Sequence, residues 1–165
     1  MSSSSKSLGA PLFRGATPRQ REIGLTILRV VVGSIFVAHG LQKFVLFGIP
    51  AVAEGFAQSG IVMPAVMAPF IALVELLGGM ALVAGLLTRL AALGTAFTML
   101  GAISLVHIQN GFFNPNGFEY PAALLAASVA IMLMGPGSFS LDAVLARRIE
   151  PAASAAGRVA SRRAA

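Results

Sequence analysis

One stretch decides the fold class: "GLTILRVVVGSIFVAHGLQKFVLF", residues 24–47. A helix rises about 1.5 Å per residue, so a run of this length can cross the roughly 30 Å hydrocarbon core of a bilayer. The apolar region of a cleaved signal peptide is shorter, roughly 7–15 residues. We therefore interpret the stretch as a retained membrane-spanning helix.

The composition of the whole chain supports this interpretation. Of the 165 residues, 56% are hydrophobic and 11% are charged, whereas a soluble domain carries about 25% charged residues. The chain has no cysteine, which excludes disulfides, thiolate metal sites and a dithiol relay. The net charge is +6, but the basic residues flank the apolar runs. That placement is typical of membrane topology signals and argues against nucleic-acid binding.

Three further apolar runs predict three more spans, at residues 65–87, 90–108 and 119–134. The last run is short and covers only about 24 Å as a helix. Glycines recur within the spans at spacings that place them on one helix face, and small residues let helices pack closely in lipid. The expected fold is all-α, an integral membrane four-helix bundle.

Lysine and arginine residues set the predicted orientation. They concentrate in the N-terminal segment, at Arg89 between the second and third spans, and in the C-terminal segment. Cytoplasmic loops carry an excess of such residues. We therefore predict a multi-pass membrane protein with both termini in the cytoplasm. Arg29, near the inner end of the first span, is expected to extend toward the inner surface.

The chain divides into four expected parts. Residues 1–23 form a flexible basic tail, residues 24–139 the bundle, residues 140–150 an amphipathic helix on the membrane interface, and residues 151–165 a mobile basic tail. In the interfacial helix Ser140 is a candidate N-cap, and Asp142 favours the positive helix start. Within the bundle, residues 48–61 are expected to form an outer-side loop with a helical turn.

Ionisable side chains inside the spans are costly and are candidates for function. Helix length places them in the outer half of the bilayer, with the glutamate of the second span near the middle. The histidine and lysine of the first span are four residues apart and are expected to share a helix face. The sequence thus predicts a polar pocket that opens outward and narrows to that glutamate. Its candidate residues are His39, Lys43, Glu75, His107 and Glu119.

Structural explanations stay open for each of these residues. Lys43 can extend to the outer headgroups, Glu119 can be a charge at a helix N-terminus, and His107 can be an interfacial residue. A buried pair between Glu75 and Lys43 can also serve only to lock the bundle.

Three segments resemble the DoxX family of small four-span bacterial membrane proteins. They are "LRVVVGSIFVAHGLQKF" in the first span, "VELLGGMALVAGLLTRLAAL" at residues 74–93, and "FEYPAALL … GPGSFSLD" at residues 118–142. The resemblance implies a four-helix bundle that is multi-pass in the bacterial cytoplasmic (inner) membrane. It implies an oxidoreductase function as well, since the related DoxD is a subunit of a thiosulfate:quinone oxidoreductase. It also implies that the family's recurrent polar positions correspond to His39, Lys43, Glu75, His107, Glu119 and Asp142.

Two functional hypotheses follow. The first is a membrane redox-associated protein that binds a quinone-like ligand in the polar pocket, with Glu75, Lys43 and His39 as the predicted catalytic residues. Lys43, His39 or His107 would donate to the quinone carbonyls, and Glu75 or Glu119 would relay protons. The sequence shows no haem, flavin or metal motif, so a diffusible quinone, the candidate cofactor, or a partner subunit must carry the electrons of any redox chemistry. The alternative is a non-catalytic subunit that binds and stabilises a larger membrane complex.

Overall fold

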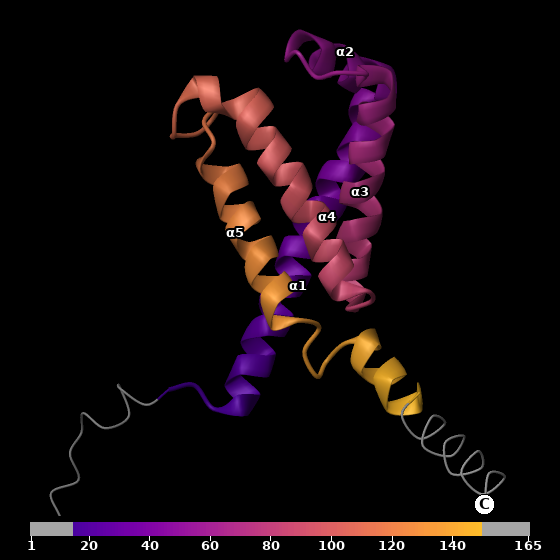
Figure 1. The fold of residues 1–165 in the computed structure, drawn as a ribbon, viewed down its shortest axis with the longest axis vertical. Coiled ribbons are helices and arrows are strands. Elements are labelled where there is room, and N and C mark those ends of the chain that lie inside the picture. The colour runs from indigo at the N-terminus through magenta and orange to yellow at the C-terminus, as the bar shows by residue number, and fades with distance from the viewer. Residues whose placement is uncertain (1–14, 150–165) are drawn as a thin grey trace, which may run out of the picture.

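The computed structural model describes residues 15–149, and every regular element in that range is a helix. This confirms the all-α prediction. The N-terminal residues 1–14 and the predicted tail at 151–165 lie outside the described part. The elements are α1 (Pro18–Leu41), η1 (Gln42–Phe47), α2 (Ile49–Gln58), α3 (Pro64–Ala84), α4 (Thr88–Gly101), η2 (Ala102–His107), η3 (Ile108–Asn110) and α5 (Glu119–Met134) (Figure 1). Residues 141–149 form one more helix.

Three helical stretches are long and apolar enough to cross a membrane: Pro18–Phe47, Pro64–Ala84 and Thr88–Asn110. The fourth, α5, is apolar but has only 16 residues, and its bounds are those predicted from the sequence. Large apolar side chains are exposed along these helices, for example Ile27, Leu77, Phe97 and Leu133. Such a surface suits contact with lipid rather than water.

The first helix begins earlier than predicted, because a capping box fixes its start. The Thr17 hydroxyl accepts a hydrogen bond from the backbone N–H of Gln20, and the Gln20 side chain accepts one from the backbone N–H of Thr17. Pro18 occupies the first turn, where its missing N–H costs nothing. The prediction of a flexible tail was therefore wrong for residues 18–23, which are helical.

Glycines bring α1 and α3 into backbone contact. A Cβ atom added at Gly33 would lie 2.7 Å from the carbonyl oxygen of Gly79, and one added at Gly40 would lie 2.6 Å from the backbone nitrogen of Leu76. No larger side chain fits at these positions without separating the two helices. The glycine-rich faces of α1 and α3 are thus used for packing within the chain, as expected for helices in lipid.

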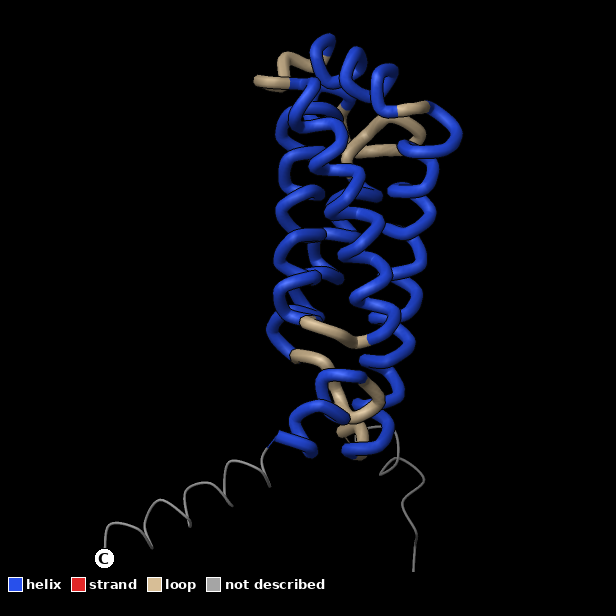
Figure 2. Tube along the Cα trace, turned by 90° about the vertical axis from the view of Figure 1, so that its right-hand side faces the viewer, coloured by secondary structure: helices blue, strands red, loops and turns tan. Residues whose placement is uncertain are grey.

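The bundle consists of two tightly packed helix pairs. The α1 helix packs mainly against α3, and α4 mainly against α5, with α3 and α4 in contact between the pairs. The buried apolar core includes Phe36, Leu82, Ile131 and Met99. Figure 1 shows the α4–α5 pair leaning away from the α1–α3 pair toward the end where α2 lies, and Figure 2 shows the helices of the bundle running along its long axis. We call these the α2 end and the opposite end.

Residues 48–61 contain more helix than predicted. Instead of a loop with one turn, they include the ten-residue helix α2, which packs against α3 and lies across the α2 end of the bundle (Figure 1). Pro50 in its first turn is compatible with a helix start. Gly48 and Gly60, both at positive φ, flank it.

At the opposite end, the segment after α5 closes the turn between α3 and α4. The Asp142 carboxylate accepts hydrogen bonds from the backbone N–H groups of Leu87 at 2.8 Å and Thr88 at 2.9 Å. It therefore caps the start of α4, in addition to lying at the start of the helix at 141–149. The hydroxyl of Ser140 accepts from the backbone N–H of Ala143, which confirms its predicted role as N-cap.

The electrostatic setting of Asp142 favours its charged form. Burial alone would raise the pKa of Asp142, but the two backbone N–H groups and the Arg29 guanidinium outweigh it and hold the pKa below its ordinary value of 3.8. Arg29 itself is only 1% exposed. Its Nη2 donates to the carbonyl oxygen of Phe139 at 2.6 Å, so it reaches toward this end of the bundle but is enclosed by protein.

Candidate functional site

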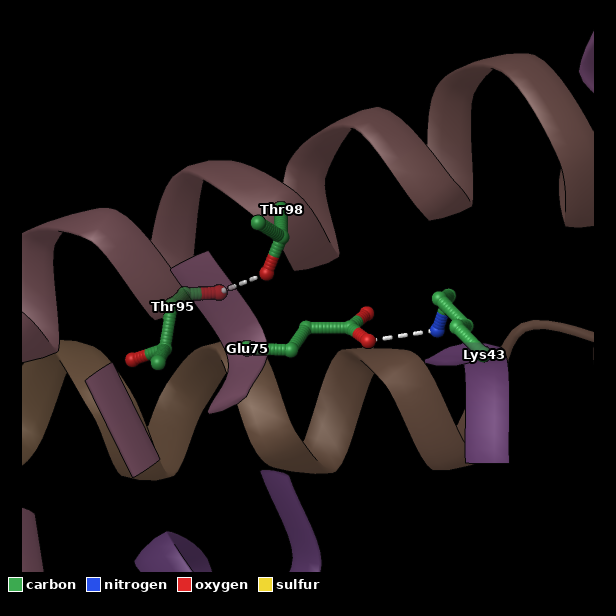
Figure 3. Close-up of polar contacts among 4 residues, drawn as sticks. All are labelled: Lys43, Glu75, Thr95 and Thr98. Carbon is green, nitrogen blue, oxygen red and sulfur yellow. Dashed lines mark hydrogen bonds and ion pairs between the residues drawn. The ribbon is translucent and has the colours of Figure 1, made fainter. Parts of the chain in front are cut away.

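A single ion pair lies inside the apolar bundle in the part of the chain that the structure describes. The Nζ atom of Lys43 is 2.5 Å from Oε2 of Glu75, and the two side chains are 18% and 5% exposed (Figure 3). Glu75 is near the middle of α3, a helix long and apolar enough to cross a membrane, and an isolated charge is most costly at the centre of such a helix. The structure thus brings together two of the five predicted pocket residues as direct partners.

Two π-helical segments shape the space around this pair. Lys43 lies on η1, which interrupts the regular α pattern of the first span, and His107 lies on η2, which does the same in the third. A π-helix has i→i+5 hydrogen bonds, is rare, and occurs frequently at functional sites. Two such segments on facing parts of one bundle are therefore a structural indication of a binding site.

A cavity of about 280 Å³ lies between these segments. Its polar lining comes from Lys43, Glu75, Thr98 and His107. The remaining lining is apolar and comes from three parts of the chain: the α2 region, α3, and the α4–η2 helix. These residues include Phe56, Ile61, Met67, Ile71, Phe97 and Leu105. The site is therefore a largely apolar cavity with one ion pair in its wall.

Hydroxyl groups continue the polar surface from the cavity into the bundle. The Thr98 hydroxyl donates to the carbonyl oxygen of Thr95 at 2.8 Å, near the Glu75 carboxylate in the view of Figure 3. The Thr95 hydroxyl in turn lies 3.1 Å from both the carbonyl oxygen of Ala92 and the hydroxyl of Ser128 on α5. All three hydroxyl residues are buried. The sequence analysis missed them because threonine and serine that bond back along their own helix are common and carry no distinct pattern.

His107 lines the cavity, and its hydrogen bond fixes which ring nitrogen it can offer a ligand. Its Nδ1 is 2.8 Å from the carbonyl oxygen of Asn116. A carbonyl can only accept, so Nδ1 carries a proton in this arrangement and Nε2 is left for a ligand. Nε2 accepts from a ligand hydroxyl when the ring is neutral and donates to a ligand carbonyl when the ring is charged.

His39 and Glu119 are placed outside the cavity. The His39 ring faces Tyr120, with ring centroids 6.2 Å apart, and lines a separate surface groove with Gln42. His39 and Lys43 are four residues apart but line different hollows, and the helix changes from α to π at Gln42, between them. Glu119 opens α5, and its carboxylate accepts from the backbone N–H of Asn114 at 2.8 Å.

No metal site competes with this cavity in residues 15–149. Within that range, no three histidine, aspartate or glutamate side chains are grouped so that they could hold a metal ion.

These features define a class: a small multi-pass membrane protein whose helices enclose a mostly apolar cavity with one ion pair. The chain belongs to the DoxX family, whose family model matches residues 24–108. Among its relatives is the Bacillus subtilis protein named "Putative oxidoreductase CatD", which is 38% identical over 121 residues, covering 73% of this chain and 86% of that protein.

Two further relatives have names that refer to membranes. The Mycobacterium tuberculosis membrane protein Rv3486 is 31% identical over 132 residues, covering 73% of this chain and 80% of the relative. The Escherichia coli inner membrane protein YqjF is 27% identical over 128 residues, covering 77% of this chain and 95% of the relative. No solved structure matches this chain. The family assignment agrees with the resemblance found in the sequence.

Proposed function

We propose that this protein is a redox-associated protein of the bacterial inner membrane that binds a quinone-like ligand in the cavity beside Lys43 and Glu75. The observation that carries this proposal is an ion pair in the wall of an otherwise apolar cavity, within helices of membrane-spanning character. Ligand sites are typically apolar with a few well-placed polar groups. The oxidoreductase name of a relative that covers most of this chain supports the redox context.

The polar groups of the cavity suit both oxidation states of such a ligand. The ammonium of Lys43 has three N–H donors, of which Glu75 uses one, so it can also donate to a quinone carbonyl. His107 Nε2 can accept a hydrogen bond from the hydroxyl of the reduced form. Glu75 is the group that would exchange protons with the ligand. The chain has no cysteine, so electrons come from another molecule, a partner protein or a diffusible reductant.

The orientation of the chain follows from its basic residues. Arg89 lies in the first turn of α4, and Arg147 and Arg148 lie on the helix after α5. These residues fall at the opposite end of the bundle from α2, and the positive-inside rule assigns that end to the cytoplasm. Both termini are then cytoplasmic, and the cavity is in the outer half of the bilayer.

Quinone binding to purified protein tests the proposal. The wild type is expected to bind an isoprenoid benzoquinone or naphthoquinone saturably, and Lys43→Met and Glu75→Gln are expected to lose that binding. His39→Gln is the matched control, because His39 is also an ionisable residue of the first span but lies outside the cavity. If the wild type binds no better than the two cavity variants, the proposal is wrong.

A second candidate function is a non-catalytic subunit of a larger membrane complex. It rests on the helix at 141–149, whose apolar side chains Leu141, Val144, Leu145 and Ile149 are 46–64% exposed. This face could contact a partner protein or the membrane interface. Purification from native membranes in mild detergent separates the two functions: a stoichiometric partner favours the subunit, and a solitary protein that retains quinone favours the first proposal.

A further inference from the structure

We infer that the cavity is loaded sideways from the bilayer, through an opening at Gly101, by an uncharged lipid headgroup whose chain stays among the acyl chains. This inference rests on the proposed function, because it specifies how the ligand of the same cavity enters and which lipids it admits.

The first observation is that the cavity wall on α4 and η2 is also the outer surface of the bundle. Phe97 and Leu105 both line the cavity, yet they are 60% and 52% exposed. Gly101 lies midway between them at intervals of four residues and also lines the cavity. A helix face that touches both the cavity and the surroundings marks a place where the cavity is open to the side.

The second observation is the empty space at Gly101. A Cβ atom added there would meet nothing within 4 Å, whereas one added at Gly94, on the same helix, would lie 3.2 Å from a side-chain carbon of Val74. Gly94 therefore serves helix packing and Gly101 does not. The missing side chain at Gly101 leaves a gap between two large side chains.

The depth of this gap indicates a lipid-borne ligand. Gly101 lies near the middle of the helical stretch Thr88–Asn110, so the gap faces the hydrocarbon region rather than the headgroups. At the α2 end, Phe56 and Ile61 contribute apolar side chains to the cavity lining. A molecule dissolved in the bilayer core therefore meets the cavity directly.

The size and charge of the cavity restrict what can enter. Its volume of about 280 Å³ is at the lower limit of ligand pockets, which measure about 300–1,000 Å³. It can accept a ring-sized headgroup but not a long chain as well. Lys43 and Glu75 together carry no net charge, so an added carboxylate would lack a free counter-charge and pay a desolvation cost. A quinone ring fits these limits, and a fatty acid does not.

A tryptophan reporter can test the inference, because the chain contains no tryptophan. Phe97→Trp places a single fluorophore at the cavity wall. Phe70→Trp is the matched control, since Phe70 is a 49% exposed phenylalanine of α3 that does not line the cavity. In lipid nanodiscs, a benzoquinone with a decyl chain is expected to quench the Phe97→Trp reporter saturably. The Phe70→Trp reporter is expected to show only quenching that rises linearly with concentration.

Closing the gap is the decisive step. In the Phe97→Trp background, Gly101→Leu is expected to raise the Kd of the tailed quinone at least about tenfold, equivalent to about 1.4 kcal/mol. Gly24→Leu is the control, because a Cβ at Gly24 also meets nothing within 4 Å and Gly24 is remote from the cavity. Gly101→Ala, which adds only that Cβ, is expected to give a smaller rise and serves if the leucine variant does not fold.

The outcomes separate this inference from the proposed function. Unchanged quinone affinity in both Gly101 variants, with affinity lost in Lys43→Met, would overturn the sideways route and leave quinone binding intact. Saturable quenching by a brominated monoacylglycerol but not by the quinone would support the sideways route and overturn the proposal that the ligand is a quinone. A brominated fatty acid that binds as tightly as the quinone would overturn the selection for uncharged headgroups. No saturable quenching by any tailed ligand would overturn both proposals.

Discussion

Replacing Lys43 with methionine is expected to destabilise the protein more than replacing Lys43 and Glu75 together. In the single variant the Glu75 carboxylate, 5% exposed, loses its partner while remaining among apolar side chains. A lone ionised carboxylate is strongly unfavourable there. The single variant therefore loses the ion pair and keeps the desolvation cost of Glu75.

Removing one partner of a buried ion pair typically costs about 3–5 kcal/mol. The free energy of unfolding of Lys43→Met should therefore fall by roughly 3–4 kcal/mol. Glu75→Gln should cost less, about 1–2 kcal/mol, because the long Lys43 side chain is already 18% exposed and can extend toward the headgroups.

The double variant, with methionine at both positions, separates a structural pair from a ligand site. It removes two desolvated charges and keeps a similar side-chain volume, so its stability should be within about 1 kcal/mol of the wild type. If the pair serves the ligand, this stable protein should nevertheless fail to bind quinone. If the pair only locks the bundle, binding should be unaffected.

Unfolding would be followed at pH 7 by circular dichroism in a non-ionic detergent, on the two single variants and the double variant, with quinone binding measured on the same samples. The reasoning would be refuted if Lys43→Met were no less stable than the double variant. A double variant that is stable and binds normally would leave the ion pair with a packing role alone.

Three further results are expected. The pKa of Asp142 is lowered in the folded state, so its carboxylate stabilises the fold above pH 3.8, its ordinary pKa, and this stabilisation is lost as the pH falls below that value. Asp142→Asn should cost about 1 kcal/mol at pH 7 and should remove this pH dependence from the free energy of unfolding, measured across the pH range. Gly79→Val should destabilise by about 3 kcal/mol or prevent folding, since its Cβ would lie 2.7 Å from the backbone of α1, whereas Gly24→Val should be near neutral. Arg29→Met should change the free energy of unfolding by no more than about 1 kcal/mol, because Nε and Nη1 of this buried side chain have no hydrogen-bond partner among the described residues. A larger loss of stability would contradict this and would show that the buried charge is well compensated.

The fold was largely predictable from sequence because its determinants are local and strong. Apolar runs longer than a bilayer is thick leave few alternatives to helices. The bounds predicted for α5 agree with the structure, because Pro121 suits its first turn and Gly135 follows its end. The start of α1 was misplaced because the capping box at Thr17 lies in polar sequence, before the apolar run that was used to define the span.

The candidate site was only partly predictable. The pairing of Lys43 with Glu75 followed from depth and charge. The spacing of His39 and Lys43 did not predict that only Lys43 lines the cavity, because which side chains meet a cavity depends on how the neighbouring helices pack. The capping of α4 by Asp142 joins residues 54 apart in the chain. Contacts of this kind require the tertiary arrangement and cannot be read from local periodicity.

The capping of α4 by Asp142 also has a consequence for biosynthesis. Thr88 and Asp142 are separated by 54 residues, so at about 5–20 residues per second the ribosome adds the cap roughly 3–11 s after it has made the first turn of α4. During that interval α3, α4 and α5 can all enter the membrane while the first amides of α4 still lack their carboxylate. A chain that stops at Met134 would contain every predicted span, yet it would lack the group that fixes the α3–α4 turn. The segment synthesised after the last span therefore determines when the nascent protein reaches its final form.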